Sequence, residues 1–269
     1  MKKLGLICLA MFLLVGCSSK PATPTASTDP SATPVTTDEA AWDSTLIQDN
    51  IISIGVSPDY PPYESLDTTN KIVGFDVDFM NLILETINKD GGNYSIEWVQ
   101  MDFSTIISAI QMEQVDLGVS GFTYDSERDV LFSTPYTESA AVVVVNPNSD
   151  IKTLEDLNGK VLAAQLGSTG EVAAKNVEGA EVNSIANVNI MMESLKNNAY
   201  DAVIIDKPVA ENYVKNAGFV MLEEPIQDDD TYIIAKTGNT VLMDKINSVI
   251  EEVKQSDAYK ALLEKWELN

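Results

Sequence analysis

The stretch VDLGVSGFTYDSER, residues 115–128, carries the pattern from which the fold is predicted. Residues 115–119 form a short, mainly apolar run that is typical of a buried β-strand, and the polar residues 120–128 are typical of a loop. Just before this stretch, apolar side chains at helical spacing predict a helix over residues 103–112. A helix, a buried strand and a polar loop in this order are typical of α/β proteins.

The same alternation continues through the rest of the chain. Further strands are predicted at 51–56, 95–99, 140–145, 161–164, 181–185, 202–205 and 231–235, and helices at 75–87, 171–176, 188–198, 208–215 and 242–266. This order favours mainly parallel sheets with helices on both faces. Ligands of such proteins bind beyond the carboxyl ends of the strands. The segments at these positions are 57–63, 120–128, 165–170 and the one that starts at Asp206.

Arg128 is the only arginine among the 17 basic residues of the chain. Its guanidinium group keeps its charge and can form two parallel hydrogen bonds with a carboxylate, which a lysine cannot do. Taken alone, Arg128 could equally form a structural ion pair with Asp125 or Asp129. Ser120 and Thr123 add hydroxyl groups to the same segment, which favours an anion-binding site.

Three other segments supply groups that suit one kind of ligand. Gly167-Ser168-Thr169 opens a helix, where N–H and hydroxyl groups can bind an anion. Asp206 ends an apolar strand, where a buried carboxylate needs a cationic partner, and Tyr60 lies among prolines and offers a ring face. An anion site, a cation site and an aromatic wall together predict a zwitterionic α-amino acid as the ligand. Each feature also has a local explanation, namely helix capping by Ser168 or Asp206 and loop packing of Tyr60.

The chain lacks the residues on which most catalytic and metal sites depend. It contains no histidine, and its two cysteines, Cys8 and Cys17, both precede the predicted fold. This excludes Ser-His-Asp and Cys-His nucleophilic sites and the common zinc sites. Carboxylate chemistry or a Lys or Ser nucleophile remains as an alternative, but we favour no catalysis and expect no metal and no cofactor. The formal net charge of −24 argues against nucleic acid as a partner.

The first 48 residues predict export and anchoring. Lys2 and Lys3, followed by the apolar residues 4–14, are typical of a signal peptide, which we place at residues 1–16. Leu14-Val15-Gly16-Cys17 resembles a bacterial lipobox, so we expect Cys17 to be acylated and to anchor the protein to the outer face of the cell membrane. An ordinary secretory signal with a chance cysteine is the alternative. Residues 17–48 are rich in Ser, Thr, Pro and Ala and predict a disordered tether.

Seven segments of the chain match one protein family in their order and spacing. They are Asp59–Glu64, Gly74–Asp78, Val115–Thr123, Glu127–Arg128, Phe132–Tyr136, Gly167–Thr169 and Asp201–Asp206. On these segments, residues 50–269 resemble the extracellular solute-binding proteins of polar amino-acid ABC transporters (solute-binding family 3). The resemblance implies a type II periplasmic-binding-protein-like fold, in which two α/β lobes, joined by two crossover hinge strands, close on the ligand. Lobe 1 would comprise residues 49–142 and 231–269, and lobe 2 residues 143–230.

The resemblance also implies a role for each site residue. Arg128 would bind the α-carboxylate of the ligand, Asp206 its α-ammonium group, and Tyr60 would stack on its side chain. The residues that would assist Arg128 are Ser120, Thr123, Ser168 and Thr169, and Gly121 is included in the site beside Ser120. The positions that would line the side-chain pocket are Ser57, Tyr60, Phe103 and Gln165.

The pocket residues leave the choice of amino acid open. Some relatives that bind cationic amino acids carry an acid at the position of Ser57, and this chain does not. Tyr60 and Phe103 could enclose a flat amide or a guanidinium group, the latter with a cation–π contribution. We therefore expect a polar amino acid and leave glutamine-like and arginine-like ligands as alternatives. For Phe103 itself, packing in the core is the alternative.

The predicted function is that of a substrate-binding lipoprotein of an ABC importer. We expect a monomer that captures a polar amino acid between its lobes and delivers it to the permease. One alternative is an enzyme on the same scaffold, a dehydratase or glycan lyase, with Glu64 or Asp59 as the proton-transferring carboxylate. Another is a sensory binding protein without a transporter. The acidic run Asp228–Asp230 has no functional explanation at this level.

Overall fold

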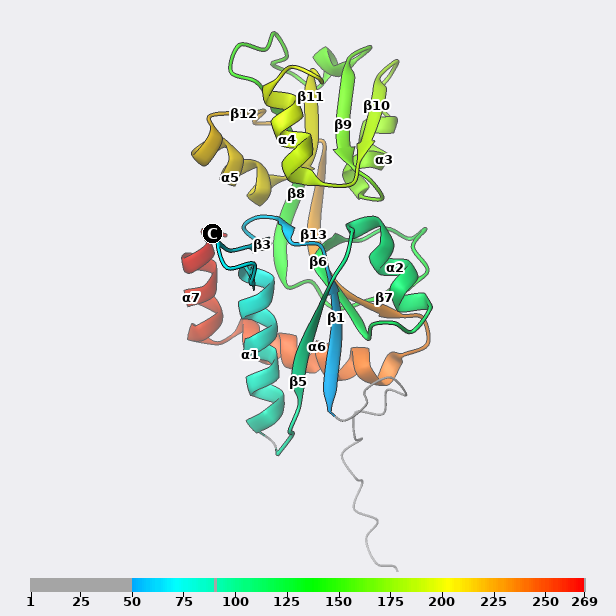
Figure 1. The fold of residues 1–269 in the computed structure, drawn as a ribbon, viewed down its shortest axis with the longest axis vertical. Helices are drawn as coiled ribbons and strands as arrows, with labels where there is room; N and C mark the ends of the chain where they lie inside the picture. The colour runs from blue at the N-terminus through cyan, green and yellow to red at the C-terminus, as the bar shows by residue number, and fades with distance from the viewer. Residues whose placement is uncertain (1–49, 90, 269) are drawn as a thin grey trace, which may run out of the picture. The chain divides into compact units, whose positions relative to one another are not determined.

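The fold is built on one mixed β-sheet that runs through two groups of helices (Figure 1). The structure is a computed structural model and describes residues 50–89 and 91–268. The main strands follow one another across the sheet in the order β10-β9-β11-β8-β13-β6-β1-β5. Two short strands are attached to this path, β12 to β8 and β7 to β13, and β2, β3 and β4 form a small separate sheet.

The strands are β1 (Ile51–Val56), β2 (Asp59–Tyr60), β3 (Glu64–Leu66), β4 (Ile72–Val73), β5 (Ser95–Gln100), β6 (Leu117–Thr123), β7 (Val130–Phe132), β8 (Thr137–Val145), β9 (Val161–Gln165), β10 (Glu181–Ile185), β11 (Ala202–Asp206), β12 (Val220–Met221) and β13 (Gln227–Lys236). The helices are α1 (Phe75–Lys89), α2 (Phe103–Gln111), a 3-10 turn (Glu155–Leu157), α3 (Thr169–Lys175), α4 (Val188–Lys196), α5 (Lys207–Ala217), α6 (Thr240–Lys254) and α7 (Asp257–Trp266).

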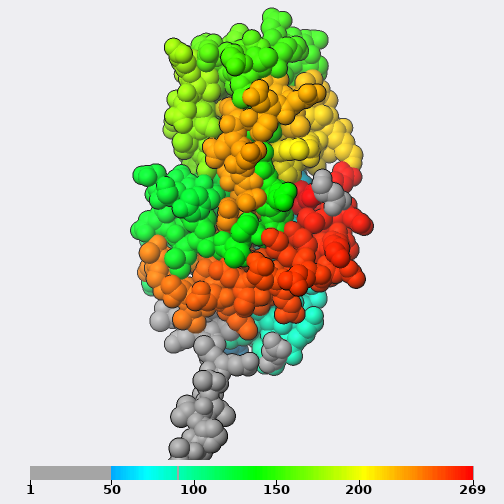
Figure 2. Space-filling view, turned by 180° about the vertical axis from the view of Figure 1, so that it is seen from behind, coloured from blue at the N-terminus to red at the C-terminus, as the bar shows by residue number. Residues whose placement is uncertain are grey.

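Two strands divide the sheet into two lobes. β1, β5 and β6 are mutually parallel at one end, in what we call lobe 1, and β9, β10 and β11 are parallel at the other end, in lobe 2. β8 and β13 pair with each other in antiparallel fashion and run from one lobe to the other, and Figure 2 shows β13 crossing between the lobes on the rear face. The expected mainly parallel α/β architecture is therefore confirmed. The predicted lobe boundaries fall inside these two strands.

Local sequence signals account for several helix limits. α2 buries Phe103, Ile106 and Ile110 on one face, which is the helical pattern seen in the sequence. α5 begins with Pro208 in its first turn and ends at Gly218, whose φ of +78° is the left-handed conformation that glycine favours.

Several predicted elements differ from the structure in their limits, and for three of them strand pairing with distant residues or a local helix cap is the reason. The strand expected at 115–119 is β6, which pairs with β13 as far as Thr123, so Ser120 and Thr123 belong to a strand end. The strand expected at 231–235 begins at Gln227, because its acidic residues pair with β8. The helical region expected at 242–266 consists of two helices, since Ser256 caps a new one.

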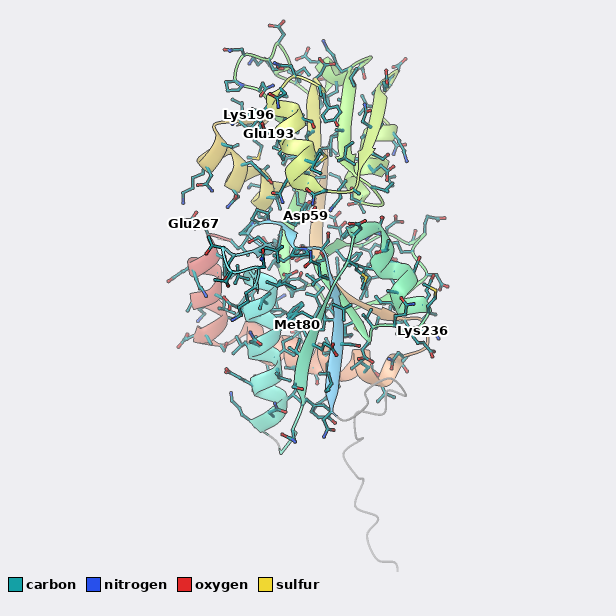
Figure 3. All side chains as sticks on the ribbon, viewed as in Figure 1. Asp59, Met80, Glu193, Lys196, Lys236 and Glu267 are labelled. Carbon is teal, nitrogen blue, oxygen red and sulfur yellow. The ribbon has the colours of Figure 1, made fainter. Side chains whose placement is uncertain are left out.

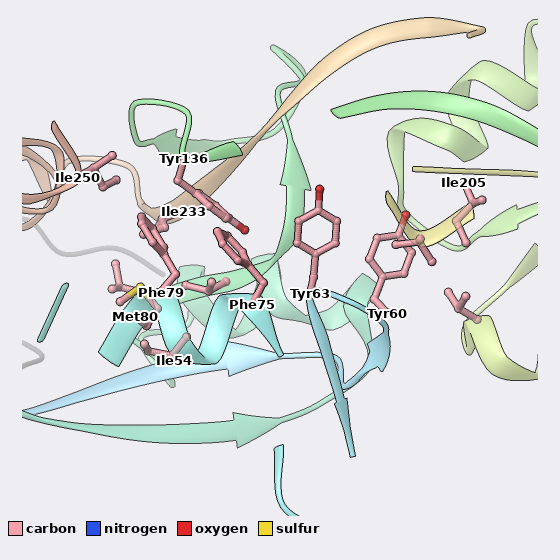
Figure 4. Close-up of a cluster of buried hydrophobic side chains, with 14 of the residues drawn as sticks. Ile54, Tyr60, Tyr63, Phe75, Phe79, Met80, Tyr136, Ile205, Ile233 and Ile250 are labelled. Carbon is pink, nitrogen blue, oxygen red and sulfur yellow. The ribbon is translucent and has the colours of Figure 1, made fainter. Parts of the chain in front are cut away.

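A series of aromatic rings connects the core of lobe 1 with the junction of the lobes (Figure 4). Tyr60 stacks on Tyr63 with ring centroids 6.2 Å apart, and Tyr63 meets Phe75 edge-on at 6.5 Å. Phe75 in turn stacks on Phe79 and Tyr136, all three of them fully buried. Such ring pairs stabilise the core and hold the Tyr60 segment on a rigid base.

The predicted signal peptide, Cys17 and the tether all lie outside the described residues. Among the helices that are described, none combines the length and apolar character that crossing a bilayer would demand.

Candidate functional site

A narrow cavity lies where the two lobes meet. It is lined by Tyr60, Phe103, Ser120, Gly121, Thr123, Gln165, Ser168, Thr169, Gly170, Ile204, Ile205 and Asp206. Nine of the eleven ligand-binding residues predicted from the sequence are in this set, and the other two, Arg128 and Ser57, lie close by. The strand ends of both lobes thus bring together the residues that the sequence pattern singled out.

Arg128 spans the opening between the lobes. Its Nη1 donates to the Thr123 carbonyl at 3.0 Å and its Nη2 to the Gly167 carbonyl of lobe 2 at 2.9 Å. The guanidinium carbon lies 5.9 Å from the ring centroid of Phe103 and 5.5 Å from that of Phe122. Within the described residues Arg128 forms no ion pair, so the structure does not support the alternative of a structural salt bridge.

Asp206 ends β11 and is 7% exposed. It stands at the N-cap position of α5, but its side chain makes no capping hydrogen bond, so the carboxylate is not used by its own helix. Burial, and to a lesser extent the charge of Asp229, raise the pKa of Asp206 to about 7, although a hydrogen bond with Tyr60 and the charge of Arg128 lower it. Because burial makes ionisation of this carboxyl group costly, a cation placed beside it would strongly stabilise the ionised form.

Several hydroxyl groups of the site already form hydrogen bonds within the protein. Thr123 Oγ1 and Thr169 Oγ1, one from each lobe, lie 2.6 Å apart and share a hydrogen bond across the cavity. Ser168 Oγ accepts from Glu171 N at 3.1 Å and donates to the Gln165 carbonyl at 2.8 Å, so it caps α3. The Ser168 hydroxyl proton is therefore not available to a ligand carboxylate.

Ser120 is bonded on both sides. Its Oγ accepts from Ser57 N at 3.1 Å and donates to Glu64 Oε1 at 2.8 Å. A hydroxyl has one proton and two lone pairs, so what Ser120 Oγ still has to offer is a lone pair. A lone pair suits the ammonium group of an amino acid and not its carboxylate, which differs from the role that the family resemblance implies for Ser120.

Tyr60 and Phe103 form aromatic walls of the cavity. Tyr60 is 7% exposed, and its hydroxyl accepts from Asp206 N of lobe 2 at 3.2 Å. Gly121 has a φ of +57°, and a β-carbon there would come within 3.2 Å of the Tyr60 ring, so glycine is favoured at this position. Phe103 stacks on Phe122 at 4.6 Å and belongs to the core of lobe 1 as well as to the cavity wall.

Gln165 and Ser57 behave differently from each other. Gln165 ends β9, is 5% exposed, and its Nε2 is buried without a hydrogen-bond partner in the described part of the chain. Because Gln165 lines the cavity, its amide is available to a ligand. Ser57 lies outside the cavity lining, beside a neighbouring groove, and its Oγ donates to Asp59 Oδ1 at 2.9 Å.

Comparison with known proteins places this arrangement in a family. Residues 52–269 match the bacterial extracellular solute-binding proteins, family 3. The chain belongs to this family. The arginine-binding extracellular protein ArtP of Bacillus subtilis is 33% identical over 222 residues, which cover 79% of this chain and 84% of ArtP.

Solved structures of related solute-binding proteins agree in fold. An ancestral arginine-binding protein bound to arginine is 37% identical, with a TM-score of 0.74, and the match covers 81% of this chain and 98% of the other. The structure of an ancestral arginine-binding protein bound to glutamine has 36% identity, a TM-score of 0.75 and the same coverage. This solute-binding protein is therefore an amino-acid-binding protein of the ABC-transporter class and not an enzyme.

Asp59 connects the lobes of this solute-binding protein, a role that the sequence did not suggest. Its Oδ2 accepts from Val188 N, the first residue of α4 in lobe 2, at 2.8 Å, and Figure 3 places Asp59 between the lobes. Burial raises the pKa of Asp59, and the hydrogen bond from Val188 N lowers it. A carboxylate at a helix N-terminus is favourable, so this contact stabilises the lobes in the arrangement in which they meet. Asp59 is not among the residues that line the cavity, which disfavours proton transfer from Asp59 to a ligand bound there.

Replacing Asp59 with alanine should favour the open form. Loss of a buried hydrogen bond to a carboxylate destabilises the closed state by about 2 kcal/mol, which lowers the apparent ligand affinity about tenfold or more. Calorimetry would measure the affinity, and small-angle scattering the radius of gyration of the ligand-free protein. The matched control is Asp67→Ala, because the Asp67 carboxylate bonds only within its own exposed turn. Unchanged affinity and radius for Asp59→Ala would contradict this role.

Proposed function

We propose that this solute-binding protein captures a cationic amino acid, L-arginine in the first place, and delivers it to a membrane permease. The observation that carries the proposal is that Asp206 of lobe 2 lines the cavity while Arg128 of lobe 1 lies at its edge, near enough for its charge to act on Asp206. A zwitterion between them would neutralise both charges only when the lobes are closed. The ligand would thereby bind the closed state more tightly than the open state, as lobe closure requires.

The geometry supports a specific binding mode. Arg128 would exchange its bonds to two backbone carbonyls for the ligand carboxylate, with the hydroxyls of Thr123 and Thr169 beside it. Asp206 would bind the ammonium group together with the free lone pair of Ser120. The ligand side chain would then extend along Tyr60 and Phe103 toward the amide of Gln165.

The charge balance around the cavity favours a cationic side chain. Arg128 experiences the charges of three acids, Asp125, Asp206 and Asp229, and the last of these lies on the crossing strand β13. A zwitterion adds no net charge, so the surroundings would stay negative, whereas arginine adds one positive charge. The relatives named for arginine support the same ligand. Glutamine is the second candidate, because Gln165 offers an amide and one ancestral relative is bound to glutamine.

We further propose that the protein is held at the outer face of the membrane by a lipid on Cys17. The lipobox-like residues 14–17 and the Ser/Thr/Pro-rich residues 17–48 support this anchor and its tether.

The ligand proposal predicts a ranking of closely related amino acids. In a thermal-shift screen, L-arginine should raise the unfolding temperature most, because a bound ligand adds stability with the logarithm of its concentration over Kd. Citrulline is the matched control ligand, since it has nearly the same shape without the charge, and it should bind at least about tenfold more weakly by calorimetry. A larger shift with glutamine would favour the second candidate. No shift with any amino acid would overturn the proposed function.

A further inference from the structure

Two fully buried carboxyl groups lie directly behind the cavity. Glu64 belongs to β3 and Asp76 to the first turn of α1, and both have 0% exposure. Glu64 Oε1 accepts from Ser120 Oγ at 2.8 Å. Asp76 Oδ1 accepts from the Tyr136 hydroxyl at 2.9 Å, and its Oδ2 accepts from Gly121 N at 3.3 Å. The pair therefore holds Ser120 and Gly121, two residues of the cavity wall, from the side opposite the ligand.

One oxygen of this pair has no donor. Glu64 Oε2 is buried and receives no hydrogen bond from any described residue, while the carboxyl groups of Glu64 and Asp76 lie within hydrogen-bonding reach of each other. In the described part of the chain no lysine or arginine pairs with either group. The ionisable groups that face the pair are Asp59, Tyr63 and Tyr136, none of which can supply positive charge. Two adjacent carboxylates in such surroundings cannot both be ionised.

We propose that Glu64 is protonated in the folded protein, donates its proton from Oε2 to Asp76, and that this shared proton positions Ser120 and Gly121 for the ligand. Glu64 Oε1 is then the carbonyl oxygen that accepts from Ser120, and every polar atom of the pair has a partner. Because Glu64 accepts the hydrogen bond that Ser120 Oγ donates, Ser120 presents a lone pair to the ammonium group of the ligand. The positioning role rests on the proposed function, whereas the protonation of Glu64 does not.

The electrostatics of the two groups agree with one proton for the pair. Burial, followed by the charge of Asp76, raises the pKa of Glu64 well above its ordinary value, although the hydrogen bond from Ser120 lowers it. Burial raises the pKa of Asp76 to about 6, while hydrogen bonds from Glu64, Tyr136 and Gly121 lower it. Because both oxygens of Asp76 already accept hydrogen bonds and Glu64 Oε2 has none, the shared proton is assigned to Glu64 and the negative charge to Asp76.

Glu64→Gln is the decisive variant, because an amide keeps both hydrogen bonds of a protonated carboxyl and cannot ionise. In an infrared difference spectrum at neutral pH, wild type minus Glu64→Gln should show the C=O stretching band of a protonated carboxyl group. The matched control is Glu85→Gln, an exposed glutamate on the same helix as Asp76, which should show no such band. If the Glu64→Gln difference spectrum lacks the band, Glu64 is ionised and the proposal is overturned.

Stability should depend on the same proton. At pH values between the ordinary Glu64 pKa of 4.5 and its raised folded pKa, folding takes up one proton. The stabilisation of the folded state by this proton is therefore complete below pH 4.5 and is lost as pH rises through the folded pKa. Within that window the unfolding equilibrium constant of the wild type should rise about tenfold per pH unit relative to Glu64→Gln. Parallel pH profiles of the two proteins would contradict the proposal.

Measurements of ligand affinity test the positioning role of Glu64 separately from its protonation. With L-arginine as the probe, Glu64→Gln should keep the wild-type Kd within about threefold, and Glu64→Ala should raise it about tenfold or more, since Ser120 loses its acceptor. If the alanine variant also binds at wild-type affinity, the pair does not position the site. If the wild type binds no amino acid at all, the proposed function fails, while the infrared result still stands on its own.

Discussion

Replacing Arg128 with alanine is expected to weaken amino-acid binding by about 100-fold or more while leaving the fold intact. The α-carboxylate would lose its cationic partner and remain desolvated in the cavity. The fold should survive, because Arg128 donates only to two backbone carbonyls at the edge of the cavity and forms no ion pair within residues 50–89 and 91–268. Calorimetry would measure the affinity, and thermal unfolding the stability.

Two further variants separate geometry from charge. Arg128→Lys should recover only part of the affinity, since an ammonium group cannot form two parallel hydrogen bonds with one carboxylate. Lys152→Ala removes a positive charge from an exposed position of lobe 2 and should bind like the wild type. If Arg128→Ala binds its amino acid at wild-type affinity, Arg128 is not the carboxylate partner.

Asp206→Asn should have an effect of similar size, about 100-fold, because the ligand ammonium group would face a neutral amide in a buried site. The wild type should also lose affinity in acid. The pKa of Asp206 is about 7 without ligand, so below that pH the ammonium group must displace a proton, and Kd should rise by up to about tenfold per pH unit. The Asn variant should lack this dependence. Calorimetry between about pH 5 and pH 8 tests both statements.

The stability of the ligand-free protein should change with pH in the direction opposite to that of the ligand affinity. A folded pKa raised from 3.8 to about 7 means that this group's stabilisation is complete below 3.8 and is lost as pH rises through 7. Asp206→Asn should therefore be less sensitive to pH between about 5 and 8 than the wild type. Asp150→Asn, an exposed acid of the same lobe, is the matched control. An Asp206→Asn variant with wild-type affinity and the wild-type pH profile would exclude Asp206 as the ammonium partner.

Much of the site could be predicted because its residues sit at the ends of strands. Thr123 closes β6 in lobe 1 and Asp206 closes β11 in lobe 2, and within each lobe the parallel strands place their carboxyl ends at one edge. Tyr60 and Phe103 carry the aromatic faces that the sequence suggested, and both line the cavity. These features depend on local periodicity and residue type, which a single sequence displays directly.

Hydrogen-bond partners could not be predicted in the same way. The resemblance assigns Ser120 and Ser168 to the ligand carboxylate and Ser57 to the side-chain pocket, with helix capping as the alternative for Ser168. In the structure Ser168 does cap its own helix, whereas the sequence did not indicate that Ser57 donates to Asp59 or that Ser120 donates to Glu64. Each hydroxyl has a single proton, and its direction depends on which acceptor the fold brings within reach.

By itself, the sequence determined the α/β alternation, the family and the chemical class of the ligand, because these follow from short-range periodicity and from residue types at strand ends. Only the tertiary structure decided how charge and protons are distributed around the cavity. Asp59 reaches a helix start 129 residues away, and Tyr136 meets Asp76 across 60 residues. The cost of burying a carboxyl group depends on such distant partners, so neither the interlobe contact of Asp59 nor the shared proton of Glu64 can be inferred before the chain is folded.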